Sequence, residues 1–243
     1  MIQLPEEVKI ISKDENKATF EIAPLYPGYG VTIGNSLRRA LLSSLNGAAI
    51  ISVKIKGVNH EFSTIPGVLE DVMEIIMNLK GIRLRLLTDG PVTMSLKVKG
   101  EKKITAEDIK APAEIQIINL SQHIATLTDK KNELEIEFVV EKGTGYEPAE
   151  QRQKEKLSVG MITIDAIFSP VETVNFTVEN IRVGQRTDYN KLILDVKTDG
   201  AVSPEEAIYK ASQILIQHFQ VIGGKEPELS TEKPKEKKKK SKK

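Results

Sequence analysis

A glycine-rich turn at residues 28–34 is the first part of this sequence whose residue types and spacing could do chemistry. It reads Gly28-Tyr29-Gly30-Val31-Thr32-Ile33-Gly34. Glycine turns that open a helix bind nucleotide phosphates when the spacing is G-x-G-x-x-G and an acidic residue follows downstream. Here the last glycine comes one residue too late, and the following strand carries no clear acidic partner. We therefore interpret these glycines as residues that permit a tight strand-to-helix turn.

Two adjacent arginines, Arg38 and Arg39, follow this turn. On a helix their side chains point about 100° apart, so at most one of them lies near the edge of the apolar face. Both could simply be solvated. One could instead bind a partner protein, because the planar guanidinium group makes bidentate hydrogen bonds at interfaces. The residues alone leave both interpretations open.

The rest of the chain offers no constellation typical of catalysis or metal binding. The sequence contains no cysteine, and its three histidines, His60, His123 and His218, lie far apart. A zinc site is therefore not expected. Adjacent acidic residues such as Glu70 and Asp71 are explained by helix solvation. We expect no catalytic residue, no metal and no cofactor in this chain.

Composition is that of a soluble globular protein: 40% of the 243 residues are hydrophobic and 28% are charged. No apolar run is long enough to span a membrane, and the first residues lack the features of a secretory signal. We expect a cytoplasmic protein with no membrane partner.

The net charge of +1 conceals an asymmetry. Residues 225–243 contain nine lysines and four glutamates, so the rest of the chain has a net charge of −4. That body lacks the basic balance of a primary nucleic-acid binder.

Two long amphipathic helices are predicted, one near each end of the chain. The first covers about residues 32–45, and one apolar stripe runs along it. The second covers residues 203–222. Ser203 is its expected N-cap, Pro204 its first helical residue, and the glycine pair ending in Gly224 its stop.

A shorter helix is predicted from residue 68 to residue 79, with Val68 and Leu69 on its buried face and Gly81 just past its end. Alternating apolar and polar residues predict half-buried strands of an antiparallel sheet. These strands lie around residues 18–22, 53–55, 134–138, 162–164, 174–178 and 192–196. Residues 141–160 are nearly free of large apolar side chains and are predicted to form a long polar loop.

Six motifs, in order and at near-family spacing, resemble those of the bacterial RNA polymerase α subunit. They are the stretch from Gly28 to Ser44, Gly57-Val58-Asn59-His60-Glu61-Phe62-Ser63-Thr64, Asn78-Leu79-Lys80-Gly81, Gly143-Thr144-Gly145-Tyr146-Glu147-Pro148-Ala149, Ser169-Pro170-Val171-Glu172 and Gln185-Arg186-Thr187-Asp188. The resemblance covers roughly residues 5–222. Any one motif would be weak evidence, but six in register leave little room for chance.

The resemblance implies an α+β fold. An α/β dimerisation domain, an antiparallel sheet with two long helices, would comprise residues 1–49 and 161–224. A β-rich domain, residues 50–160, would be inserted into it. Residues 225–243 would form a disordered lysine-rich tail. Most family members continue into a small helical DNA-binding domain, and we expect none within these 243 residues, whether the chain is naturally short or a fragment.

The implied function is that of a non-catalytic scaffold within DNA-directed RNA polymerase, a nucleotidyltransferase that acts in transcription. The chain would form a homodimer on which the β and β′ subunits assemble, and it would meet DNA indirectly. The resemblance assigns subunit contacts to Arg39, Leu42, Lys80, Arg182 and Arg186. Lys80 could equally be a lysine favoured by the helix dipole, and the last two arginines could be surface ion pairs.

Dimerisation would also resolve a packing problem, because a domain this small cannot easily cover two long apolar helices. A two-fold dimer would pack them against their symmetry mates. The expected dimer contacts are Ile33, Leu37, Leu41, Ile208, Ala211, Leu215 and Phe219.

Two other function classes remain open at this stage. One is a small homodimeric enzyme that uses residues 141–160 as a lid. The other is a protein that binds the phosphate backbone of nucleic acid through its lysine tail. The same tail could also be only a solubilising end.

Overall fold

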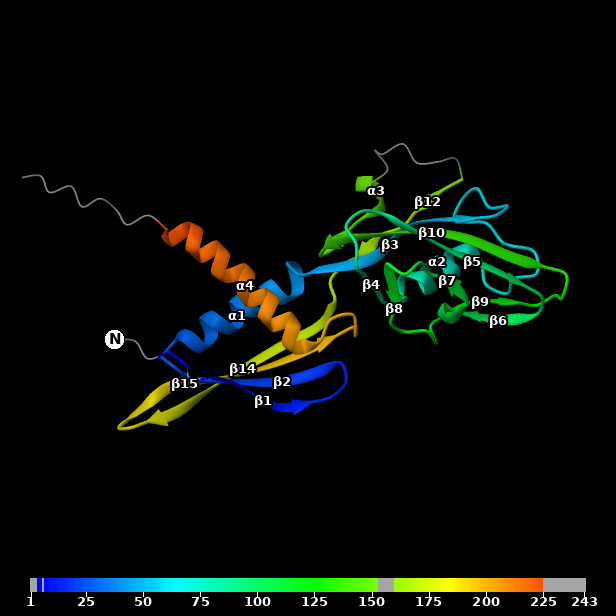
Figure 1. Ribbon diagram of the computed structural model, residues 1–243. Coiled ribbons are helices and arrows are strands. Elements are labelled where there is room, and N and C mark those ends of the chain that lie inside the picture. The colour runs from blue at the N-terminus through cyan, green and yellow to red at the C-terminus, as the bar shows by residue number, and fades with distance from the viewer. Residues whose placement is uncertain (1–3, 6, 153–159, 225–243) are drawn as a thin grey trace, which may run out of the picture.

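The computed structural model describes residues 4–5, 7–152 and 160–224 and has two lobes, each with its own sheet and its own apolar core (Figure 1). The sheets are antiparallel and the helices are few. The expected α+β class is therefore confirmed at this level. The predicted lysine-rich tail, residues 225–243, lies outside the described residues.

The four-stranded lobe is a sheet with two helices on one of its faces (Figure 1). Its strands lie in the order β1 (Glu7–Lys13), β2 (Lys17–Leu25), β15 (Arg186–Thr198) and β14 (Val171–Val183). The helices are α1 (Tyr29–Ser43) and α4 (Pro204–Gly223). As the alternation in β2 predicts, Ala18, Phe20 and Ile22 are buried with the apolar faces of the helices.

Helix α4 begins and ends as predicted. The Ser203 hydroxyl accepts a hydrogen bond from the Glu206 amide at 3.2 Å, Pro204 is the first helical residue, and Gly224 is the C-cap. Helix α1 instead begins at Tyr29, three residues earlier than expected. Its first amides are capped by a residue of strand β15. The side-chain oxygen of Asn190 accepts hydrogen bonds from the amides of Gly28 at 2.9 Å and Gly30 at 3.3 Å.

The seven-stranded lobe is built around a sheet in the order β7 (Ile109–Lys110), β5 (Val92–Lys99), β10 (Glu133–Thr144), β3 (Asn46–Ile55), β4 (Leu84–Leu86) and β8 (Ile115–Ile117), with β12 (Ile162–Thr163) paired to β3. Two small sheets complete it, β6 (Lys102–Thr105) with β9 (His123–Leu127) and β11 (Tyr146–Glu147) with β13 (Ala166–Ile167). Its helices are α2 (Val72–Lys80), α3 (Ala149–Arg152) and a 3₁₀ turn at Ala106–Asp108.

The predicted start of the helix at residue 68 is wrong. Helix α2 begins at Val72, because the Asp71 carboxylate caps it by accepting from the Glu74 amide at 2.7 Å. Leu69 precedes the helix and is 72% exposed, so its predicted place on the buried face is also wrong. The expected stop at Gly81 is confirmed, since Gly81 is the C-cap.

The prediction of a long polar loop at residues 141–160 is wrong in its first part. Strand β10 continues through Thr144, and residues 141–144 pair with residues 46–49 of β3. Their backbone groups are satisfied by this ladder, so the segment needs no large apolar side chains to be ordered. Residues 153–159 of the predicted loop lie outside the described residues.

Helix α1 lies very close to the sheet beneath it at Gly34. A Cβ atom added to Gly34 would fall 2.7 Å from the Phe176 ring and 3.0 Å from a Leu192 methyl group. No side chain therefore fits between this turn of α1 and strands β14 and β15.

We predict that Gly34→Ala lowers the free energy of unfolding by up to about 2 kcal/mol in total, because the extra methyl group overpacks the interface between α1 and the sheet at a cost of about 1–3 kcal/mol. This cost outweighs the gain of about 1 kcal/mol that alanine brings to a helix. Urea denaturation followed by circular dichroism at fixed protein concentration measures the change. Gly223→Ala is the matched control, because a Cβ there meets no atom within 4 Å. A Gly34→Ala protein as stable as this control would contradict the close packing.

Candidate subunit-assembly surfaces

Helix α1 presents both of its arginines to solvent. Arg38 and Arg39 are exposed, and neither guanidinium forms an ion pair with any residue that the structure describes. Leu42 lies three residues beyond Arg39 and is half-buried, with its side chain packed on the core of the four-stranded lobe. Arg39 and Leu42 are thus neighbours on the helix surface, where residues three apart face each other.

Lys80, the last residue of α2, is held within the seven-stranded lobe. Its ammonium group donates to one oxygen of Asp165 at 2.9 Å, and the amide of Ala149 donates to the other at 3.0 Å. The Ala149 amide and the Lys80 ammonium both favour the ionised carboxylate, so they hold the pKa of Asp165 below its usual range. A partner that binds Lys80 must share it with Asp165.

The hairpin tip, residues 182–188 between β14 and β15, carries the other two predicted arginines. Arg182 donates from its Nε to the carbonyl of Gly184 at 2.9 Å. Arg186 forms a bidentate pair with Asp188, at 3.0 and 2.7 Å, which raises the pKa of the arginine. Both arginines are exposed, and both already have a partner in their own chain.

Two tyrosines stack on Arg186 and were missed by the sequence reasoning. The guanidinium carbon lies 5.6 Å from the ring centre of Tyr26 and 5.5 Å from that of Tyr189, which is cation–π geometry. Tyr26 follows β2, so this cluster depends on how β2 pairs with β15, and no local spacing in the sequence indicates it.

The residues predicted for self-association fall into two groups. Four of them are buried in the core of their own lobe: Leu37, Leu41, Ile208 and Ala211. Leu41 and Ala211 are fully buried and offer no surface to another molecule. Ile33 and Leu215 are partly buried, while Phe219 is 62% exposed.

An uncovered apolar strip, missed by the sequence reasoning, continues from Phe219 along the end of α4. Its other members on this helix are Ile216 and Ile222, each within about 60° of Phe219 around the helix axis. Val221 is 85% exposed but points to the other side of the helix. Figure 1 shows these last turns extending beyond the sheet, so the sheet cannot cover them. Val31 at the start of α1 is also exposed. The signal for the strip was the apolar pattern of α4, which continues to the glycine pair.

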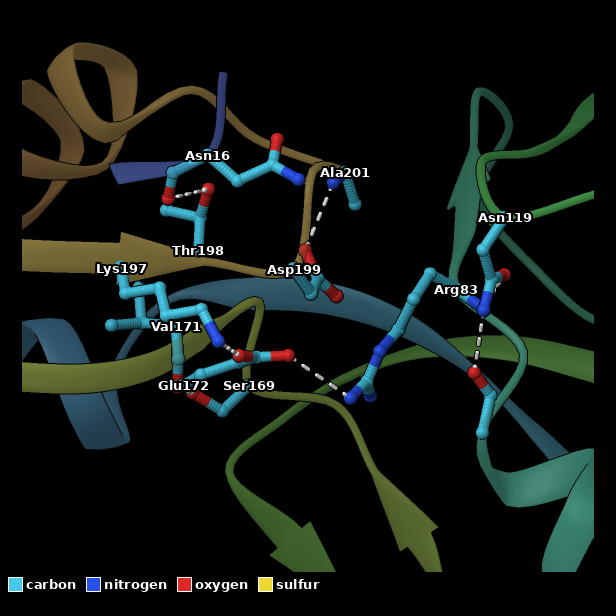
Figure 2. A network of polar contacts seen from close by, with 11 residues as sticks. Asn16, Arg83, Asn119, Ser169, Val171, Glu172, Lys197, Thr198, Asp199 and Ala201 are labelled. Carbon is cyan, nitrogen blue, oxygen red and sulfur yellow. Dashed lines mark hydrogen bonds and ion pairs between the residues drawn. The ribbon is translucent and has the colours of Figure 1, made fainter. Parts of the chain in front are cut away.

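The glutamate of the Ser169-Pro170-Val171-Glu172 motif turns toward the other lobe (Figure 2). One Glu172 oxygen accepts from Arg83 of the seven-stranded lobe at 3.2 Å, and the Lys197 ammonium lies 2.8 Å from the other. Sequence reasoning missed Arg83 because the contact joins residues 89 positions apart. This motif therefore forms part of the contact between the lobes.

In the part of the chain that the structure describes, no three acidic or histidine side chains gather in a way that could hold a metal ion. No helix among the same residues is long and apolar enough to cross a membrane.

Comparison with known proteins accounts for both lobes. The family model described as the RNA polymerase Rpb3/RpoA insert domain matches residues 53–169. The DNA-directed RNA polymerase subunit alpha of Roseiflexus sp. strain RS-1 is 49% identical over 221 residues, which cover 91% of this chain and 68% of the relative. The subunit of the same name from Alkaliphilus oremlandii strain OhILAs is 50% identical over 216 residues, covering 89% and 68%. With such identity on both sides of the matched insert, this chain belongs to the family of bacterial DNA-directed RNA polymerase alpha subunits.

Proposed function

We propose that this chain is a non-catalytic scaffold subunit of DNA-directed RNA polymerase, which dimerises and then holds the large β and β′ subunits during assembly. The observation that carries this proposal is the 49% identity to a subunit of that name over 91% of the chain. The nucleotidyl transfer itself would be performed by the assembled enzyme.

The α4 strip supports self-association. Phe219 and Ile222 are each more than half exposed and lie on the same face at the end of one helix. An exposed apolar surface of this kind marks an interaction site. A two-fold dimer would bury the strip against its own copy, because the same patch then serves both partners. Ile33 and Leu215 would border it, while the fully buried Leu41 and Ala211 would support it from beneath.

The α1 surface around Arg39 and Leu42 supports contact with a large subunit. Arg39 projects its guanidinium to solvent beside a half-buried leucine. An exposed arginine next to an apolar side chain is typical of an interface centre. Lys80 and the hairpin tip with Arg182 and Arg186 would extend this contact surface to β and β′.

We infer a division into a dimerisation domain, residues 1–49 and 161–224, and an inserted domain, residues 50–160, and the presence of two lobes supports it. The match of the insert family model to residues 53–169 supports this division. The seven-stranded sheet extends past both proposed boundaries, because β3 begins at Asn46 and β12 lies wholly beyond residue 160. Contact of the lysine tail with DNA stays a prediction.

Phe219→Ser is expected to weaken self-association by roughly 30-fold or more, because each protomer of a two-fold dimer loses an aromatic contact worth about 2 kcal/mol. Light scattering during size exclusion measures the mass, which should fall from about twice 27.0 kDa toward 27.0 kDa on dilution. The matched control is Phe62→Ser, since Phe62 is 77% exposed but lies on the other lobe. Equal loss of the dimer in both variants, or in neither, would contradict the assignment of the strip.

Arg39→Ala is expected to leave the dimer intact and to weaken capture of the β subunit by about 10- to 100-fold, the range for loss of charged hydrogen bonds at an interface. Capture is measured by co-purification and surface plasmon resonance with the β subunit of the same source. Arg38→Ala provides the matched control, because that arginine is equally exposed but points in another direction. Loss of the dimer in Arg39→Ala would show that the two surfaces are not separate.

A further inference from the structure

The two lobes are joined where the chain crosses between them twice. Strand β3 leaves the four-stranded lobe after α1, and residues 168–170 return to β14. The two crossing segments lie in close contact at Gly47 and Phe168. A Cβ atom added to Gly47 would fall 1.8 Å from the carbonyl oxygen of Phe168, so no side chain fits there. Two crossings side by side form a joint about which lobes can rotate, and relative motion is the default for domains with a small shared interface.

Arg83 provides a contact between the lobes beside this joint, since the next residue, Leu84, pairs with Ala48 of β3. It follows α2 in the turn that leads to β4, and its side chain points toward Glu172 (Figure 2). Its backbone is fixed by two hydrogen bonds. Its amide donates to the side-chain oxygen of Asn119 at 2.7 Å, and its carbonyl accepts from the Ile118 amide at 2.9 Å. The side chain therefore projects toward the four-stranded lobe from a fixed base.

The acceptor on the other lobe is also held in place. Glu172 accepts from Arg83 at 3.2 Å, and Lys197 holds its second oxygen. The Lys197 hydrogen bond holds the pKa of Glu172 below its usual range, so the carboxylate stays ionised at neutral pH.

Asp199 of the four-stranded lobe lies near the same pair of residues, Arg83 and Glu172. Its amide donates to the carbonyl of Pro170 at 3.0 Å, and its carboxylate accepts from the Ala201 amide at 2.9 Å. Burial raises the pKa of Asp199, and the nearby Arg83 opposes this shift. Arg83 thus faces two carboxyl groups of the four-stranded lobe, each placed by bonds within that lobe.

The strength of the pair is modest, because the side chains of Arg83 and Glu172 are 31% and 32% exposed. Such pairs change equilibria by a factor of about five at most. Glu172 is already held by Lys197, whereas only the backbone of Arg83 is fixed by other bonds, so forming the pair still orders the Arg83 side chain. Its effect is therefore on the orientation of the lobes.

We propose that Arg83 and Glu172 form an interlobe latch that sets the distance between two parts of the large-subunit surface, Arg39 with Leu42 on α1 and Lys80 at the end of α2. Lys80 precedes Arg83 by three residues in the same turn, so fixing Arg83 fixes Lys80 relative to the four-stranded lobe. Both latch residues are positioning residues, and the identity of the captured partner rests on the proposed function.

The latch acts through pre-organisation. A partner that must contact both lobes binds only the fraction of molecules with the correct lobe orientation, and its apparent dissociation constant rises as that fraction falls. Breaking the latch should therefore weaken capture of the β subunit by up to about fivefold.

The test measures lobe orientation directly and separately from capture. Since the chain contains no cysteine, spin labels can be placed at Ser95→Cys on β5 and Thr177→Cys on β14, both exposed. Labelled chain is diluted in excess unlabelled chain, so that distances within one protomer are recorded by pulsed electron resonance. The unmodified latch should give one narrow distance distribution, and Arg83→Met and Glu172→Gln should broaden it.

Two further variants separate the latch from a general effect on stability. Arg83→Lys, which keeps the charge, should largely restore the narrow distribution. Arg85→Met removes an exposed arginine two positions away and should leave both the distances and β capture unchanged. Arg83→Met should also lower β capture by up to about fivefold.

An unchanged distance distribution in Arg83→Met would overturn the latch, whatever happens to capture. A broadened distribution with unchanged capture would overturn its role in placing the large-subunit surface. If the unmodified chain captures neither large subunit, the proposed function fails, and the distance measurement still decides whether the latch exists.

Discussion

The contact on which the rest of the structure depends is the packing of Phe168 against two glycines, Gly47 and Gly143. Gly47 of β3 and Gly143 of β10 are register partners. A Cβ atom on Gly143 would fall 2.5 Å from the Phe168 ring, and one on Gly47 would fall 1.8 Å from the Phe168 carbonyl. The returning chain can cross β3 only because neither residue of this strand pair has a side chain. That crossing starts β14 and so places the four-stranded sheet beneath α1.

This contact explains why local patterns predicted the elements better than their arrangement. The start of α4 was predictable because an N-cap serine, a first-turn proline and a terminal glycine pair act within a few residues. Strands such as that at residues 134–138 were predictable for the same reason, since their alternating burial is a local property. The two glycines that contact Phe168 lie far apart in the sequence, so their pairing can be recognised only once β3 and β10 are aligned.

The wrong predictions have two causes, pairing between distant segments and a local cap that the apolar spacing concealed. Residues 141–144 were taken for a loop because they lack large apolar side chains, but their order comes from hydrogen bonds to β3. The helix start at residue 68 followed apolar spacing, whereas the Asp71 cap sets the true start. Tyr26 and Arg83 could not be assigned as site residues, because the partners of each are brought to it only by the tertiary fold.

The charged residues of the proposed surfaces differ in what binding would require of them. Lys80 and Arg186 already have carboxylate partners in their own chain, so a large subunit would have to compete with Asp165 or Asp188. Arg39 has no such partner among the described residues, and it gains a new interaction without losing one. We therefore argue that Arg39 supplies affinity, while the paired residues supply shape and charge complementarity. On the proposed function, such a scaffold would bind through an unpaired arginine of α1, and it would select its partner through groups that its own fold has already oriented.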